Sequence, residues 1–326
     1  MSLLGRIKPD WYLIFIIGAG VLASLLPARG DAAIWLGWLT KIAIALVFFL
    51  HGARLSREAV VRGVVHWRLH LAILAATFVV FPALTVGLVL LPAWITPPEL
   101  AAGLILLGCL PSTIQSSIAF VSIARGNVPA AVASASASNL IGVFLTPLLA
   151  GLLMRTEGAI NPGSFWTIIV QLLLPFVLGQ VARPWVGGVM ARHGKFLGAL
   201  DRGTIVLIVY VAFSGAVVAG VWSRLGALDL VRLVVICAAL LGVVLAMTAY
   251  VARALGFSKA DEIAIVFCGS KKSLASGAPI AAALLAPAVA GVAMIPLMIF
   301  HQIQLMACAA LAQRYAQRPD IEAESV

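Results

Sequence analysis

The sequence is short of charge. Only 10% of its 326 residues are charged and 63% are hydrophobic, whereas about a quarter of the residues in an ordinary soluble domain are charged. Twenty-nine glycines and sixteen prolines lie within this apolar background, a mixture typical of transmembrane helices. The composition excludes a soluble enzyme, a disordered tail and a fibrous protein, and it predicts a polytopic membrane protein.

Cysteine and catalytic motifs are equally scarce. The four cysteines, Cys109, Cys237, Cys268 and Cys308, lie in apolar runs without CxxC or Cys/His spacing, as is usual for small buried side chains. No HExxH, GxSxG or phosphate-binding loop motif is present. The sequence therefore predicts a protein that is not an enzyme, with no catalytic residue, no metal site and no cofactor.

Long apolar runs dominate what is there. Each is about 18–25 residues long, enough to cross the hydrocarbon layer as a helix, and none alternates as barrel strands do. Arg6 and Lys8 precede the first run without a small-residue cleavage site after it, so we expect a retained helix rather than a signal peptide. Ten runs lie near residues 11–28, 33–50, 69–92, 98–124, 129–154, 164–184, 203–222, 230–254, 261–286 and 290–313.

The net charge of +10 is distributed unevenly between the loops. With a cytoplasmic N-terminus, fifteen of the twenty-two Lys and Arg residues fall on the inner side and four on the outer side. This bias follows the positive-inside rule and does not indicate a nucleic-acid surface. We expect a multi-pass protein of the cell (inner) membrane with both termini and the loops 51–68 and 185–202 in the cytoplasm. Segment 51–68 is either an ordinary loop or lies along the inner membrane surface.

The fourth and ninth runs are polar in the middle. Their centres hold Pro111-Ser112-Thr113, then Gln115, Ser116 and Ser117, and Gly269-Ser270-Lys271-Lys272-Ser273. Proline and glycine weaken the helical hydrogen-bond ladder, and breaks at membrane depth need protein or a watery cavity to satisfy the freed groups. We expect residues 111–115 and 269–273 to be non-helical or distorted and to lie side by side near the midplane.

The two polar centres are related by half the chain. Lys271 lies within three residues of the position half a chain length beyond Pro111, and five runs lie in each half. Because five is odd, the halves must have opposite orientations. Interrupted helices at matching places in inverted halves are typical of secondary transporters. The sequence predicts one transporter domain, 1–326, of ten helices in two inverted five-helix repeats, about 11–154 and 164–313.

The fifth run adds a polar face. Ser134 and Ser138 are four residues apart and share one side of a helix, so they can face the break in the fourth run. The alternative is close helix packing through small residues, which we favour for Ser136. Asn139 is different, because a buried amide needs hydrogen-bond partners.

These residues carry a family resemblance. The stretches GCLPSTIQSS (108–117), ARGNVPAAVASASASN (124–139) and LTP (145–147) resemble the fourth and fifth helices of the bile acid:sodium symporter superfamily. The resemblance covers essentially the whole chain and implies ten spans, inverted five-helix repeats and broken, crossing helices four and nine. FCGSKKSLASGAPI (267–280) is similar to the divergent branch of animal member-seven proteins and bacterial homologues.

The sodium ligands that the resemblance implies are mostly replaced. The family pattern has a Ser-Asn pair in helix four, hydroxyls in helix five, a Gln in helix three, and a Glu and a Gln in helix nine. Here Ser116-Ser117 matches the pair with Ser in place of Asn. Thr77, Phe267 and Lys271 stand at the helix-three Gln, the Glu and the helix-nine Gln. All twelve acidic residues lie at span ends, in loops or in tails. We expect a degraded sodium site, and coupling to a proton or to no ion rather than to Na⁺.

Two lysines at the centre of a span are expensive to insert and are candidates for function by default. Adjacent helical residues point about 100° apart, so only one of Lys271 and Lys272 can face a cavity fully. The alternative is that both merely hydrogen-bond the carbonyls of the broken helices. The candidate binding residues are Thr77, Thr113, Gln115, Ser116, Ser117, Ser134, Ser138, Asn139, Ser270, Lys271, Lys272 and Ser273.

Two functions fit these features. The favoured one is a secondary active transporter that moves a small organic, anionic solute by alternating access. The other is a non-transporting membrane regulator of ion or calcium homeostasis that keeps the same fold. In both cases the expected partners are the lipid bilayer and a small solute, with no nucleic acid. His301 is either a proton relay or a packing residue hydrogen-bonded to Gln302 and Gln304.

Overall fold

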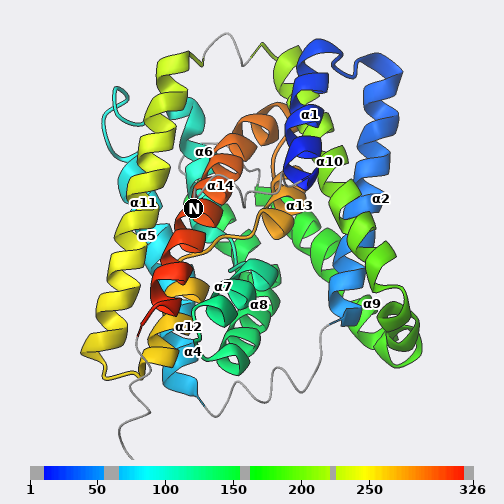
Figure 1. The fold of residues 1–326 in the computed structure, drawn as a ribbon. Coiled ribbons are helices and arrows are strands. Elements are labelled where there is room, and N and C mark those ends of the chain that lie inside the picture. The colour runs from blue at the N-terminus through cyan, green and yellow to red at the C-terminus, as the bar shows by residue number, and fades with distance from the viewer. Residues whose placement is uncertain (1–10, 55–65, 155–161, 221–224, 319–326) are drawn as a thin grey trace, which may run out of the picture. The chain divides into compact units, whose positions relative to one another are not determined.

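The structure, a computed structural model, describes residues 11–54, 66–154, 162–220 and 225–318 and contains no strand within them (Figure 1). The all-helical prediction is therefore confirmed. In chain order the elements are α1 (Trp11–Leu25), α2 (Gly30–Arg54), α4 (Trp67–Ala75), the π-helix η2 (Ala76–Val80), α5 (Phe81–Val89), the 3₁₀ turn η3 (Pro98–Leu100), α6 (Ala101–Cys109), α7 (Ile114–Ile123), α8 (Val128–Met154), α9 (Pro162–Arg192), α10 (Gly194–Val218), α11 (Ala227–Ala254), α12 (Lys259–Gly269), α13 (Leu274–Leu284) and α14 (Pro287–Ala316).

Several helices are long and apolar enough to cross a bilayer. Within the described residues there are six such helices: Gly30–Arg54, Trp67–Val89, Val128–Met154, Phe196–Val218, Ala227–Ala254 and Pro287–Ala316. A seventh span is formed if α6 and α7, bent by 62° at the break between them, are counted as one. The protein is thus a multi-pass membrane protein.

One predicted loop is wrong. Residues 185–202 were expected to form a cytoplasmic loop, but α9 continues to Arg192 and α10 begins at Gly194, so only His193 separates the two helices. The bias of basic residues reports the side of the membrane and not the backbone conformation, and Arg and Lys are themselves good helix formers. The other predicted loop, 51–68, is helical to Arg54, and most of its remainder lies outside the described residues.

The chain divides into two compact units. Unit 1 comprises Met1–Arg54, Pro162–Gly226 and Ala278–Met294, and unit 2 comprises Leu55–Asn161, Ala227–Gly277 and Ile295–Val326. Each unit draws on both halves of the sequence. The division of the chain into one domain of two repeats, about 11–154 and 164–313, stays a prediction.

Unit 1 is held together by close backbone contacts. A Cβ atom on Gly52 of α2 would overlap the carbonyl oxygen of Phe176 in α9, and one on Gly179 of α9 would overlap that of Phe49 in α2. Such reciprocal small-residue contacts let two helices approach closely where lipid provides no hydrophobic driving force between them. No predicted site residue belongs to unit 1, so the candidate site is a property of unit 2 alone.

Unit 2 contains α4 to α8, α11, α12 and most of α14. Its apolar core includes Ile73, Ala131, Phe267 and Cys268, all at most 1% exposed. The π-helix η2 interrupts the span Trp67–Val89 halfway, and the Phe81 N–H bonds to the carbonyl of Ala76, five residues earlier. A π-helix of one turn inside an α-helix often marks a functional site.

Candidate functional site

Both predicted helix breaks are present. The helix α6 ends at Cys109 and α7 begins at Ile114, while α12 ends at Gly269 and α13 begins at Leu274. The breaks are therefore 110–113 and 270–273. Each is shorter than predicted, because Gln115 already lies in α7 and Gly269 still lies in α12.

The two breaks lie side by side and satisfy each other's polar groups. Ser273 N donates to the Pro111 carbonyl at 2.9 Å, and the Ser112 hydroxyl donates to the Cys268 carbonyl at 2.6 Å. The Thr113 hydroxyl donates to the Lys272 carbonyl at 3.0 Å. Backbone groups released by a broken helix must find partners within the protein when water is absent. The predicted juxtaposition of the breaks is confirmed.

The helix α8 presents a serine and an amide to the first break. The Ser138 hydroxyl accepts from Ser112 N at 3.0 Å, and Asn139 Nδ2 donates to the Ser112 carbonyl at 2.7 Å. Asn139 Oδ1 in turn accepts from the Ser276 hydroxyl of α13 at 3.0 Å. The side chains of α8 thus bind the main chain of one break and link it to the helix that follows the other. Ser134, also predicted here, is elsewhere, 2.6 Å from Nδ1 of the buried His70.

Lys272 sends its ammonium into a ring of main-chain carbonyls. Its Nζ donates to Thr77 O at 2.7 Å, Gly108 O at 2.6 Å and Leu110 O at 2.8 Å. The ring of Phe81 covers the ammonium at 4.2 Å from its centroid, and the side chain is only 1% exposed. We call these three oxygens the carbonyl cage. The three protons of the ammonium have three acceptors, so its hydrogen-bonding capacity is filled.

The local backbone explains why these carbonyls are available. In an α-helix Thr77 O would accept from Phe81 N, but that N–H bonds to Ala76 O in the π-turn, and the next residue, Pro82, has no N–H. Gly108 O would accept from Ser112 N, which instead donates to the Ser138 hydroxyl. A π-turn followed by proline and a helix end therefore leave oxygens free for the lysine.

Gln304 of α14 belongs to the site, although the sequence pointed to it only as a partner of His301. Its Oε1 accepts from Lys272 N at 2.9 Å, and its Nε2 donates to the Lys272 carbonyl at 2.9 Å. One amide side chain thus pairs with both polar groups of the Lys272 residue, much as a neighbouring strand would. His301 Nδ1 is 2.9 Å from Gln304 Nε2, in agreement with the packing interpretation of that histidine. The available signal was the polar group His301, Gln302 and Gln304 in the middle of a long apolar run.

Lys271 points elsewhere. Its side chain is 0% exposed, and its Nζ lies 3.7 Å from the centroid of the Phe120 ring. No hydrogen-bond acceptor for it occurs among the described residues. The two lysines diverge as predicted, although both lie in the break and not in a helix: Lys272 meets main-chain carbonyls and Lys271 has no polar partner in the described chain.

Most of the other predicted hydroxyls bond within or next to their own helices. Thr77 Oγ1 donates to Ile73 O at 2.8 Å and Ser270 Oγ donates to Val266 O at 2.6 Å. Ser117 reaches across to the Phe267 carbonyl at 3.2 Å. The Ser116 hydroxyl is buried without a partner in the described residues, and Gln115 is exposed. Thr77 therefore contributes to the site through its carbonyl and not through its hydroxyl.

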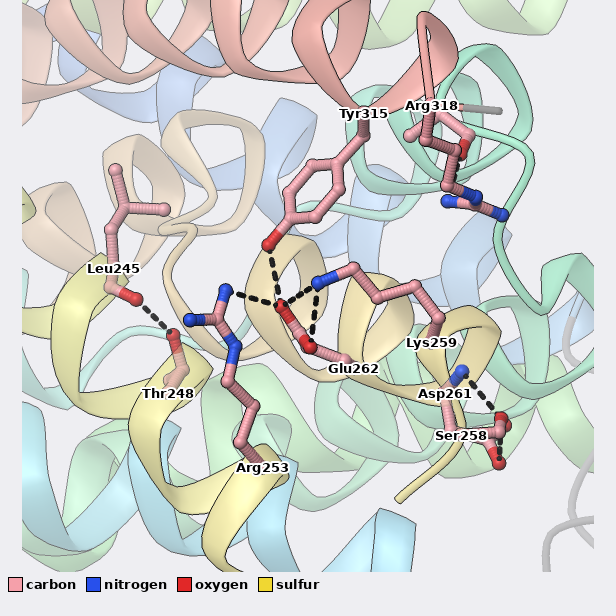
Figure 2. A network of polar contacts seen from close by, with 10 residues as sticks. Leu245, Thr248, Arg253, Ser258, Lys259, Asp261, Glu262, Tyr315 and Arg318 are labelled. Carbon is pink, nitrogen blue, oxygen red and sulfur yellow. Dashed lines mark hydrogen bonds and ion pairs between the residues drawn. The ribbon is translucent and has the colours of Figure 1, made fainter. Parts of the chain in front are cut away.

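A buried acidic side chain lies at the start of α12. Figure 2 shows Arg253, Lys259 and Tyr315 converging on the carboxylate of Glu262, with Arg253 NH2 at 2.9 Å, Lys259 Nζ at 2.8 Å and the Tyr315 hydroxyl at 2.9 Å. The Glu262 side chain is 4% exposed, but those of Arg253 and Lys259 are 63% and 46% exposed. This group, the Glu262 cluster, ties together α11, α12 and α14.

Known proteins of similar sequence include transporters. The model of the SBF-like CPA transporter family matches residues 10–317. The chain is 52% identical over 319 residues to "Uncharacterized protein PA2026" of Pseudomonas aeruginosa, an alignment that covers 97% of this chain and 95% of the relative. It is 51% identical over 318 residues to "Putative symporter YfeH" of Escherichia coli, with 95% and 94% covered. Mouse "Sodium/bile acid cotransporter 7" is 27% identical over 317 residues, with 94% and 92% covered.

The matches confirm the resemblance that the sequence carries. They extend over nearly the whole chain and over nearly the whole of each relative, and the names they bring are those of transporters and not of enzymes. The paired helix breaks and the buried lysines described above are thus features of a transport protein. The chain belongs to the SBF-like CPA transporter family.

Proposed function

We propose that this protein is a secondary active transporter that moves a small organic anion by alternating access. In this proposal ten helices form two inverted five-helix repeats in the cell (inner) membrane, with both termini cytoplasmic. The observation that carries it is the pair of hydrogen-bonded helix breaks, 110–113 and 270–273, with two buried lysines at the second. Matching interrupted helices are the usual place for a transporter's substrate.

The anionic nature of the solute is argued from Lys271. A buried ammonium is costly without a partner, and no acceptor for this one occurs in the described chain. Glu262, the only acidic residue buried among those described, already has three donors. A carboxylate, sulfonate or phosphate on a solute would supply the missing partner. The Ser116 hydroxyl, also buried without a partner, is a second candidate contact.

The surroundings of Phe267 favour a sodium site that lacks the family's usual carboxylate. Phe267 stands where the family pattern has a Glu, and its ring lies 6.0 Å from that of Phe120 and 6.1 Å from that of Tyr315. An aromatic contact of this kind offers Na⁺ no oxygen ligand, whereas hard cations bind through oxygen. We therefore favour coupling to a proton or to no ion, with Lys271 as the residue able to exchange the proton.

The decisive experiment is a ligand screen followed by uptake. Small organic anions would be tested for a rise in the melting temperature of the purified protein, and each hit for accumulation in proteoliposomes with and without Na⁺. We expect a stabilising anion whose uptake does not depend on Na⁺. A set of stabilising ligands of which none is accumulated would favour a regulator that keeps the fold.

Lys271→Gln tests the assigned residue. We expect the variant to fold and to lose at least about tenfold in affinity for the anion, since a charge-assisted hydrogen bond contributes roughly 1.5–3 kcal/mol. Wild-type affinity in a folded Lys271→Gln protein would show that Lys271 does not bind the anion.

The topology is tested separately by labelling a cysteine at position 60, which lies outside the described residues. It should react from the cytoplasmic side only.

A further inference from the structure

We infer that Lys272 is a tethered cation, whose ammonium fills a monovalent-cation site built from main-chain carbonyls. The protein therefore holds its two helix breaks together without a bound metal ion. This inference concerns the assembly of the site and does not depend on which solute is moved, or on whether one is moved at all.

The chemistry of the carbonyl cage is that of a cation site. All three acceptors of Lys272 Nζ are main-chain oxygens, at 2.6–2.8 Å. Rings of backbone carbonyls replace the hydration shell of a monovalent ion in channel filters. Gly108 O and Leu110 O also lie at the carboxyl end of α6, where the helix dipole favours positive charge. The face of Phe81 adds a cation–π contact at 4.2 Å.

The cage is held in place by contacts that do not involve Lys272. A Cβ on Gly108 would overlap the Thr85 side chain, so α6 and α5 are in direct contact at this point. Cys109 lies between Gly108 and Leu110, and its carbonyl accepts from the Thr146 hydroxyl at 2.8 Å. The π-turn orients Thr77 O through its own hydrogen bonds. Removing the lysine side chain should therefore leave the oxygens in position and create an unfilled site for a small cation.

Lys271 provides a matched comparison. It is the neighbouring residue, it is equally buried, and it also lies over an aromatic ring, but it has no carbonyl acceptor among the described residues. Any effect that comes merely from removing a buried lysine next to an aromatic ring should appear in both positions. An effect of the carbonyl cage should appear at Lys272 only.

The experiment uses the purified full-length protein and measures its melting temperature. The variants are Lys272→Ala, Lys272→Met and Lys271→Ala, each in choline chloride, in NaCl, in KCl and with n-propylammonium chloride. The n-propylammonium ion corresponds to the Cγ–Cδ–Cε–Nζ fragment that the Ala substitution removes. The Met substitution keeps most of the bulk and removes the charge, so it leaves no room for the added ion.

The expected result has three parts. Wild type melts at the same temperature in Na⁺ and in choline. Lys272→Ala melts lower by at least about 5 °C, and n-propylammonium restores at least half of the loss in a saturable manner. Neither Lys272→Met nor Lys271→Ala responds to n-propylammonium.

Several results would overturn the inference. These are stabilisation of wild type by Na⁺ over choline, absence of rescue in Lys272→Ala, or equal rescue in Lys271→Ala. A Lys272→Ala protein that can be purified only with n-propylammonium present would support it. A Lys272→Ala protein that does not fold with or without that ion would count against it.

Discussion

Glu262 and Lys272 of unit 2 are buried, have opposite charges and lie ten residues apart along the chain, and their charges are satisfied in opposite ways. Lys272 is surrounded by three carbonyl oxygens and an aromatic face, with no carboxylate among its partners in the described chain. Glu262 is surrounded by two cations and a phenol. Fixed dipoles hold the first charge, whereas long and partly exposed side chains hold the second.

The position of each charge follows the helix dipoles. Glu262 lies in the first turn of α12, whose amino end favours an anion, and Lys272 meets the carboxyl end of α6, which favours a cation. The difference lies in what happens when the charge is removed. Arg253 and Lys259 can turn to water, because their side chains are already 63% and 46% exposed, but the buried main-chain carbonyls of the cage cannot. The cage should therefore tolerate loss of its charge less well than the Glu262 cluster.

The largest effect is expected for Lys272→Met. Removing one partner from a buried charged network costs about 3–5 kcal/mol, which corresponds to a fall in melting temperature on the order of 10 °C. The measurement is thermal unfolding of the purified variant in detergent. Lys271→Met is the matched control and should be neutral or stabilising, because it removes a buried ammonium without an acceptor in the described chain. Equal losses in the two variants would contradict the assignment of the cage to Lys272.

Glu262→Gln should have a smaller effect. The amide keeps the size of the side chain and can still accept from Tyr315, while Arg253 and Lys259 can relax toward water. We expect a loss of about 1–3 kcal/mol, as for a hydrogen bond to a charged group. If this variant were less stable than Lys272→Met, the proposed contrast between dipole and side-chain partners would be wrong.

Gln304→Leu should be milder again. It removes two hydrogen bonds to the main chain of Lys272 but leaves the ammonium in its cage. Two neutral hydrogen bonds together contribute on the order of 1–3 kcal/mol, and the leucine regains part of this through apolar burial. Gln302→Leu on the same helix is the control and should lie within about 0.5 kcal/mol of wild type. Similar losses at 302 and 304 would mean that Gln304 acts only by general packing.

The smallest effect is that of salt. Raising NaCl from 0.1 M to 1 M shortens the Debye length from about 10 Å to about 3 Å, which should screen the partly exposed partners of Glu262. The stability difference between wild type and Glu262→Gln should then shrink by a few tenths of a kcal/mol. The corresponding difference for Lys272→Met should not change, because the cage is closed to solvent. If salt changed both stability differences equally, the expectation would be wrong, because dissolved ions would then be able to reach the cage.

Much of this site could be predicted from the sequence because its signals are side chains out of place in apolar runs. Pro111, Ser112 and the Lys271-Lys272 pair located both breaks, and Asn139 was expected to need partners. What could not be predicted is main-chain chemistry. Nothing in a list of polar side chains reveals that Thr77 contributes its carbonyl.

The direction of the two lysines also depended on tertiary structure. Helical spacing predicted that Lys271 and Lys272 diverge, but both lie in the break, and spacing cannot show which of them meets the carbonyls. Gln304 was not predicted as a site residue because its partner is a main-chain group from a segment thirty-two residues earlier. The helical course of 185–202 was missed because charge bias carries no information on backbone conformation.

The π-turn at Ala76–Val80 makes the length of the span Trp67–Val89 part of the site. A π-turn is equivalent to one inserted residue in an α-helix, so deleting a single residue from this segment would restore a regular helix. The deletion would rotate everything before it by about 100° relative to α5. With the deletion placed after Thr77, the residue four positions on would be Pro82, so Thr77 O would still have no helical donor, but it would turn away from Lys272. The cage therefore depends on the number of residues in this span as well as on their identity. A deletion could destroy it without a substitution at any position that contacts the lysine.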